Sequence, residues 1–96
     1  MYNIVLDMVE TKTVEIKNAL GLHARAAAKL VNLTNQYKAT IVLERNGAEA
    51  DGKSLLSVLA LACPKGNRIT IKAEGSDARK AIKGLEKLIE DKFGEE

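Results

Sequence analysis

The feature of this sequence that most constrains its fold is Asn46-Gly47, which lies between two short segments of strand-like residues. Asn-Gly is the strongest short signal for a two-residue hairpin turn, because such turns need positive φ angles at both central positions. Residues 40–45 alternate, with Ile41 and Leu43 on one face, and residues 48–51 follow the turn directly. The sequence therefore predicts an antiparallel hairpin in the middle of the chain.

Two further segments, residues 12–17 and 68–74, alternate between apolar and polar residues in the same way. Alternation of this kind is typical of a strand with one buried face. The apolar positions are Val14 and Ile16 in the first segment and Ile69, Ile71 and Ala73 in the second. One apolar face on each strand predicts a single sheet with one solvated side.

Three segments have helical spacing instead. The first begins after His23 and ends near Gln36, the second is a short apolar run over residues 55–61, and the third begins with Ser76 as N-cap and Asp77 in its first turn. The buried face of the first is predicted to hold Ala27, Leu30, Val31 and Thr34, and that of the third Ala78, Ala81, Ile82, Leu85, Leu88 and Ile89. The order β-α-β-β-α-β-α predicts an α+β open-faced sandwich.

With 96 residues the chain fits one domain, which we expect over residues 11–96. Residues 1–10 are expected to be an N-terminal extension. Within this extension Tyr2, Ile4 and Leu6 alternate, which leaves open an additional edge strand.

The charge and composition argue against several classes of function. Fifteen basic and thirteen acidic residues are mixed along the chain, and only three residues are aromatic, which disfavours nucleic-acid binding. The sequence has a single His and a single Cys without ligand-like spacing, so we expect no metal site. It has no glycine-rich nucleotide-binding loop, so we expect no nucleotide cofactor. Because no apolar run could span a membrane and no secretory signal begins the chain, we expect a cytoplasmic protein.

The candidate for chemistry is His23, the only histidine, at the predicted junction between a loop and a helix. Helix N-termini expose unpaired N–H groups and favour anions. Arg25 follows within the first turn and offers a guanidinium suited to phosphate oxygens. A neutral imidazole has one unprotonated nitrogen that can act as a nucleophile. These residues fit a phosphoryl acceptor, although a lone His at a helix start also fits a residue that only caps or solvates the terminus.

The segment Gly21-Leu22-His23-Ala24-Arg25-Ala26-Ala27 resembles the active-site signature of HPr, the histidine phosphocarrier of the bacterial phosphotransferase system. The similarity covers roughly Thr11 to Phe93 and extends through Asn46-Gly47, Lys53-Ser54-Leu55-Leu56, Lys65-Gly66 and Ile69-Thr70-Ile71. The resemblance implies the HPr fold, in which three helices cover one face of a four-stranded antiparallel sheet. Ala26 departs from the family, which usually has proline there, and adds a backbone N–H donor to the first turn.

The resemblance also implies the route of the phosphoryl group. His23 would accept it on Nδ1 from phosphorylated enzyme I and donate it to an enzyme IIA, with Arg25 positioning the phosphate. Ser54 is first an N-cap, and it also matches a regulatory serine that an HPr kinase/phosphorylase modifies in some bacteria. Sugar uptake and a nitrogen-type regulatory branch both stay open as the pathway. A monomer is the simplest expectation for a carrier that alternates between partners.

A partner-binding patch is expected around the histidine, formed by Leu22, Ala26, Ala27, Leu55, Leu56 and Leu59. Within the short second helix we expect Leu55 and Leu59 to be partly exposed and Val58 and Leu61 to be buried. Two other functions stay open. One is a regulatory binding module controlled by the histidine or by Ser54, and the other, disfavoured by composition, is a small RNA-binding or ligand-binding domain.

Overall fold

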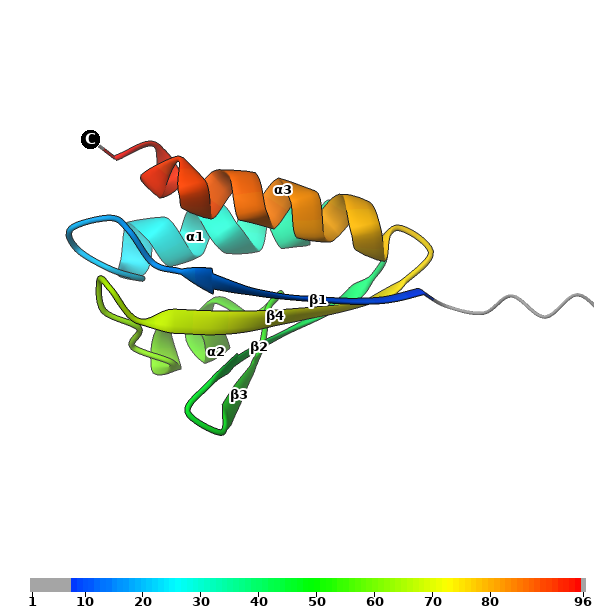
Figure 1. Cartoon of the computed structure of the whole chain (residues 1–96), viewed down its shortest axis with the longest axis horizontal. Helices are drawn as coiled ribbons and strands as arrows, with labels where there is room; N and C mark the ends of the chain where they lie inside the picture. Colours follow the sequence, from blue (N-terminus) through cyan, green and yellow to red (C-terminus); the bar gives the residue numbers. More distant parts are fainter. Residues whose placement is uncertain (1–7, 96) are drawn as a thin grey trace, which may run out of the picture.

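The computed structural model describes residues 8–95 as a four-stranded antiparallel sheet with three α-helices (Figure 1). The elements in chain order are β1 (Met8–Glu15), α1 (Ala24–Thr34), β2 (Thr40–Arg45), β3 (Ala48–Asp51), α2 (Leu55–Ala60), β4 (Arg68–Gly75), α3 (Ala78–Glu90) and a 3-10 turn, η1 (Lys92–Gly94). The predicted order and the α+β open-faced sandwich are confirmed.

The sheet has the strand order β1-β4-β2-β3, so β4 lies between β1 and β2. The register pairs Val14 with Ile69 and Leu43 with Ile71, which places the apolar residues of the three strands on one face. These four side chains are buried. Residues on the opposite face of β4, such as Lys72 and Glu74, are exposed, and that face of the sheet stays open.

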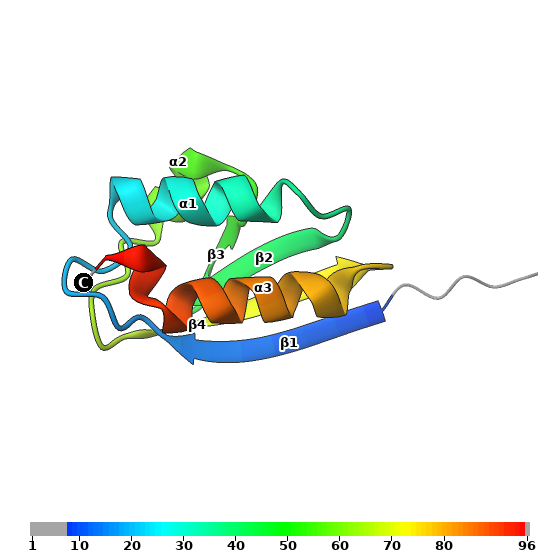
Figure 2. The same cartoon turned by 90° about the horizontal axis from the view of Figure 1, so that it is seen from above.

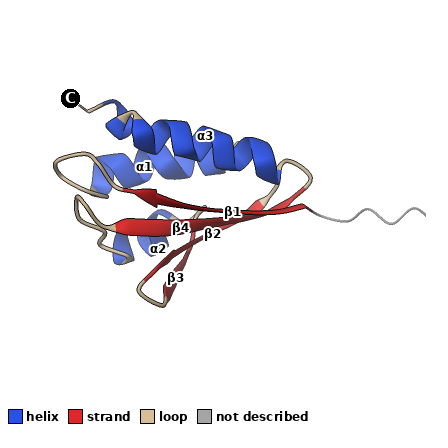
Figure 3. Ribbon diagram, viewed as in Figure 1, coloured by secondary structure: helices blue, strands red, loops and turns tan. Residues whose placement is uncertain are grey.

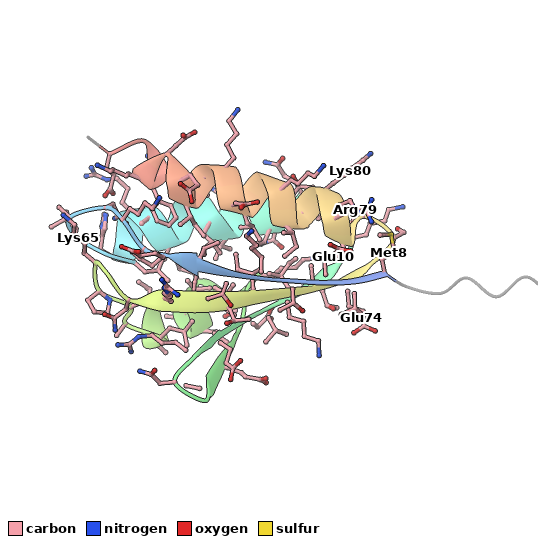
Figure 4. All side chains as sticks on the ribbon, in the orientation of Figure 1. Met8, Glu10, Lys65, Glu74, Arg79 and Lys80 are labelled. Atoms are coloured by element: carbon pink, nitrogen blue, oxygen red, sulfur yellow. The ribbon has the colours of Figure 1, made fainter. Side chains whose placement is uncertain are left out.

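β1 begins at Met8 and not at the predicted Lys12. The earlier part of the strand escaped the alternation pattern because, after Met8, the residues that face the helices are the charged Glu10 and Lys12. Glu10 lies 3.9 Å from Arg79 and Lys12 lies 3.4 Å from Glu86, both partners being on α3. Figure 4 shows Glu10 and Arg79 at the end of the molecule where Met8 begins the strand. The possible edge strand at Tyr2, Ile4 and Leu6 lies outside the described residues.

The predicted hairpin is confirmed, with β2 and β3 at their expected bounds. Arg45 pairs with Ala48 across the turn, and both turn residues have positive φ angles, 52° at Asn46 and 83° at Gly47. Positive φ at both central positions is the geometry that favours Asn-Gly in two-residue hairpins.

The helices α1 and α3 lie side by side over one face of the sheet (Figures 1 and 2), and α3 packs over β1 and β4. The short helix α2 packs beside α1 and against β3. In Figure 3, α1 and α3 form a layer above β1 and β4, and α2 is drawn below β4. The largest fully buried apolar side chains are Ile16, Leu30, Ile41, Leu43, Val58, Ile69, Ile71, Leu85, Ile89 and Phe93. They form one core between the helices and the sheet.

The predicted start of α3 was wrong by one residue. Ser76 is not its N-cap, because β4 continues through Gly75 and the chain turns at Ser76 and Asp77, which makes Asp77 the N-cap. The Asp77 carboxylate does not cap its own helix and instead accepts the backbone N–H groups of Lys38 and Ala39, both at 2.8 Å. These two hydrogen bonds hold the pKa of Asp77 below its usual range, and the bond from Lys38 has the larger effect.

Candidate functional site

The loop before α1 places His23 through a tight turn built on Gly21. The backbone N–H of Gly21 donates to Asn18 O at 3.0 Å, His23 N donates to Gly21 O at 2.9 Å, and Leu22 N donates to Cys63 O at 2.8 Å. Gly21 has a φ of 67°, and a Cβ at this position would lie 2.7 Å from Cys63 O. Glycine is therefore required here for both conformation and space.

His23 is the N-cap of α1, as the sequence predicted from the loop-to-helix junction. Its backbone is extended (φ −80°, ψ −179°), and its carbonyl accepts the first helical bond, from Ala27 N at 2.8 Å. The imidazole makes no capping hydrogen bond, so it leaves the first-turn N–H groups without a side-chain acceptor. The first turn contains no acidic side chain. Arg25 lies in this turn, is exposed, and makes no side-chain hydrogen bond or ion pair within residues 8–95.

Two residues that the sequence analysis missed complete the surroundings of His23. Its Nε2 forms a hydrogen bond with Oε2 of Glu95, which lies 72 residues away in the chain. The buried Asn18 donates from Nδ2 to Glu95 Oε1 at 2.9 Å and to Gly21 O at 2.6 Å. The hydrogen bond from Asn18 has the largest effect on the pKa of the Glu95 carboxyl and lowers it. The contact with His23 also lowers this pKa, whereas burial raises it, and the net result is a pKa below the usual range.

The segment after α3 turns back to bring Glu95 to this site. Figures 1 and 2 both place this segment, drawn in red, beside the loop that joins β1 to α1. Lys92, Phe93 and Gly94 all have positive φ angles, of 56°, 57° and 73°. Phe93 is 1% exposed, and its carbonyl accepts a hydrogen bond from Lys29 Nζ at 2.7 Å. Burial of the ring and the bond from α1 therefore hold two non-glycine residues in a conformation that is unfavourable by about 1–2 kcal/mol each.

Ser54, the second candidate, is the N-cap of α2, as predicted. Its backbone is extended, and its Oγ accepts a hydrogen bond from Ser57 N at 3.3 Å. The side chain is partly buried. The hydroxyl of Ser54 is therefore engaged in starting its helix, unlike the imidazole of His23.

The predicted partner-binding patch is divided between exposed and buried residues. Leu55 and Leu56 are 41% and 80% exposed and Leu59 is partly buried, whereas Val58 and Leu61 are buried as expected. The side chains of three other members of the patch are buried in the core, namely Leu22, Ala26 and Ala27. They support the site from beneath and leave no side-chain surface for a partner. Leu20, which the sequence analysis did not include, is 72% exposed in the loop before His23.

Within residues 8–95, no group of three or more His, Cys, Asp or Glu side chains is placed to hold a metal ion. The described part of the chain also encloses no pocket. None of its helices combines the length and the apolar composition that crossing a membrane requires. Cys63 is a buried free thiol whose pKa is raised by burial. His23 is thus partly exposed at the surface of the described part of the chain and does not line a cavity.

Comparison with known proteins gives one consistent result. A family model described as "PTS HPr component phosphorylation site" matches residues 10–91. The chain is 41% identical over 80 residues to phosphocarrier protein HPr of Cupriavidus necator, which covers 83% of this chain and 90% of the relative. It is 39% identical over 90 residues to phosphocarrier protein NPr of Proteus mirabilis, covering 93% of this chain and all of the relative.

A solved structure agrees with these relatives. The crystal structure of HPr-C-His from Thermoanaerobacter tengcongensis superposes with a TM-score of 0.88 at 41% sequence identity, and the match covers 91% of this chain and 98% of that one. The strand order, the helices and the sequence around His23 thus lead to the same conclusion. This chain belongs to the HPr/NPr family of phosphocarrier proteins of the phosphotransferase system.

Proposed function

We propose that this protein accepts a phosphoryl group on Nδ1 of His23 from phosphorylated enzyme I and donates it to an enzyme IIA. The observation that carries the proposal is the engagement of the two ring nitrogens. Nε2 is occupied by Glu95, whereas no hydrogen bond within residues 8–95 reaches Nδ1. The imidazole side chain is 25% exposed, which leaves a partner access to the ring.

The transfer is a displacement at phosphorus. The lone pair of Nδ1 forms the new N–P bond while the bond between phosphorus and the donor breaks, and the donor leaves with that electron pair. The ring keeps its proton on Nε2. Donation to the acceptor reverses these steps and restores a neutral imidazole. The protein is thus phosphorylated and dephosphorylated in turn.

The start of α1 suits the phosphate that would sit beside His23. The first-turn N–H groups and the positive end of the helix favour an anion by about 0.3–1 kcal/mol at an exposed terminus. Ala26 contributes a backbone N–H that a proline would lack. Arg25, with no ion pair of its own within residues 8–95, is available to reach the phosphate oxygens.

Leu20 in the loop before His23 and Leu55 and Leu56 at the start of α2 are exposed apolar side chains that would contact enzyme I and the enzyme IIA, because burying them against a docked protein removes apolar surface from water. Ser54 serves as a regulatory site for an HPr kinase/phosphorylase. The carrier acts in the cytoplasm as a monomer, since one histidine has to meet its donor and its acceptor in turn.

Intact-mass analysis tests the proposal directly. After incubation with phosphoenolpyruvate and a cognate enzyme I, we expect an acid-labile gain of one phosphoryl group in wild type and in Ser54→Ala, and none in His23→Ala. Circular dichroism checks that each variant is folded. No gain in wild type with an active enzyme I, or a gain that persists in His23→Ala, would overturn the assignment and favour a regulatory module centred on Ser54.

A further inference from the structure

The contact between His23 and Glu95 is part of a chain of three side chains. Asn18 is fully buried and uses Nδ2 to donate both to the loop carbonyl of Gly21, at 2.6 Å, and to Glu95 Oε1, at 2.9 Å. The other carboxylate oxygen, Oε2, meets His23 Nε2. Each carboxylate oxygen therefore has its own donor, which fixes the orientation of the carboxylate toward the ring.

Glu95 is also held in place through the backbone on either side of the turn. Phe93 is buried in the core, Lys29 binds its carbonyl, and Glu95 N donates to Lys92 O at 3.0 Å. The Glu95 side chain is only 15% exposed. A carboxylate on a loose segment would not be expected to be this well enclosed, so its position opposite the ring is determined by the fold.

A hydrogen bond to one imidazole nitrogen determines what the other can do. A carboxylate accepts but does not donate, so the nitrogen that faces it carries the proton and the opposite nitrogen keeps its lone pair. We propose that Glu95 is a positioning residue for phosphoryl transfer, which holds His23 in the Nε2–H tautomer, orients Nδ1 for attack, and stabilises the cationic ring that the transfer creates. This inference rests on the proposed role of His23 as the phosphoryl acceptor.

The charge balance of the transfer explains why a carboxylate suits this place. When Nδ1 forms its bond to phosphorus while Nε2 keeps its proton, the ring becomes a phosphorylated imidazolium with one positive charge. Glu95 faces that charge from the side opposite the phosphate, and no proton has to move in either direction. Asn18, His23 and Lys29 all favour the ionised carboxyl, which keeps the negative charge in place at neutral pH.

The first test uses the unphosphorylated protein and needs no partner. Long-range ¹H–¹⁵N spectra, recorded well above the ordinary imidazole pKa of about 6.5, report which ring nitrogen carries the proton. We expect wild type to show the Nε2–H tautomer with a slowly exchanging Hε2 proton. Glu95→Ala is expected to lose that protection and to show a measurable fraction of the Nδ1–H tautomer.

A second variant separates orientation from charge. In Glu95→Gln only one oxygen remains for the two donors, Asn18 Nδ2 and His23 Nε2, and the negative charge is gone. We therefore expect a wild-type tautomer that persists in part and a slower phosphorylation rate. Glu95→Ala loses both oxygens and the charge and is expected to be phosphorylated at least about tenfold more slowly, by analogy with the lower end of the losses seen when a metal-bound histidine loses the partner of its other ring nitrogen. Glu86→Gln removes a carboxylate that pairs with Lys12 on β1 and serves as the matched control, with wild-type behaviour in both assays.

The outcomes separate this inference from the proposed function. If wild type is not phosphorylated at all, the carrier role fails whatever the spectra show. If wild type is phosphorylated but Glu95→Ala keeps either its tautomer and Hε2 protection or its phosphorylation rate, the role of Glu95 is overturned. A loss of both in Glu95→Ala, with the Glu86→Gln control unchanged, supports it.

Discussion

The starts of α1 and α2 resemble each other in sequence and differ in what their N-cap side chains do. Each N-cap follows a glycine by two residues, Gly21 before His23 and Gly52 before Ser54. The Ser54 hydroxyl accepts the N–H of Ser57 and so stabilises its own helix. The His23 ring makes no such bond and turns toward Glu95. A helix start can thus either satisfy its own amides or keep them free for a ligand.

The two helices differ in how much their stability depends on a side-chain cap. α1 has 11 residues and buries Ala26, Ala27, Leu30 and Thr34, so packing holds it without a side-chain cap. α2 has 6 residues and buries only Val58. Short helices are marginal without outside support, so the cap matters more to α2 than to α1. The comparison predicts that the native N-cap side chain stabilises the protein at the start of α2, whereas at the start of α1 it serves chemistry.

The largest expected effect is that of Gly21→Ala, which tests the turn that presents His23. The positive φ and the approach of Cys63 O within 2.7 Å of the new Cβ predict a loss of about 3 kcal/mol in the free energy of unfolding. Gly47→Ala is the control, because Gly47 has a φ of 83° but nothing within 4 Å, and we expect a loss of about 1 kcal/mol. Urea denaturation measures both, and equal losses would show that space around Gly21 is not limiting.

The next effect concerns the cap of α2. Ser54→Ala is expected to lower the free energy of unfolding by about 1 kcal/mol because Ser57 N loses its acceptor. Ser54→Asp should stay close to wild type, since Asp is an equally good N-cap. If chemical denaturation shows that both variants lose the same stability, the cap is not the reason for the loss.

At the start of α1, adding a capping side chain is expected to stabilise the protein, whereas at the start of α2 removing one destabilises it. His23→Ser introduces a capping hydroxyl where the native side chain does not cap, and it should be more stable than His23→Ala by about 0.5–1 kcal/mol. Neither variant should accept a phosphoryl group in the intact-mass assay. Equal stabilities of the two variants would mean that the first-turn amides gain nothing from a cap, and the contrast between the helices would fail.

The smallest expected effect is a pH dependence at Glu95. Because the folded state lowers the pKa of this carboxyl from its ordinary 4.5, Glu95 stabilises the protein fully above that value. The contribution is lost as the pH falls below 4.5 and through the lower folded value. Denaturation of wild type and Glu95→Gln over an acidic pH series should show their difference in stability shrinking in that range. A difference that grows as the pH falls would contradict the direction of the shift.

Local patterns in the sequence were sufficient for most of the fold. The hairpin was predictable because Asn46-Gly47 fixes its turn, and β2 and β3 have the expected bounds for the same reason. The position of His23 at a helix start and the cap at Ser54 were also predictable, since both depend on residues next to them in the chain. The start of β1 was not, because ion pairs with α3 replace apolar contacts there.

The missing part of the site depends on contacts between distant residues. Glu95 reaches His23 only because the chain reverses through positive φ angles at Lys92 and Phe93, a conformation that no local preference of these residue types predicts. The burial of Phe93 and the bond from Lys29 stabilise that path, and both are tertiary contacts. Asn18 gave one faint signal, a turn-forming residue three positions before a glycine, which does not indicate contact with a carboxylate.

The turn at Lys92–Gly94 also decides where a label or a fusion partner can be attached for experiments. A bulky label attached at Glu95 would lie beside the imidazole ring and would compete with a docking protein for the same space. In Figure 1 the β2–β3 hairpin lies below β4, whereas this segment lies above β1, and Glu49 within the hairpin is exposed. Because the single native cysteine is buried, Glu49→Cys would supply one reactive thiol at which the protein can be tethered or made fluorescent with its histidine left accessible.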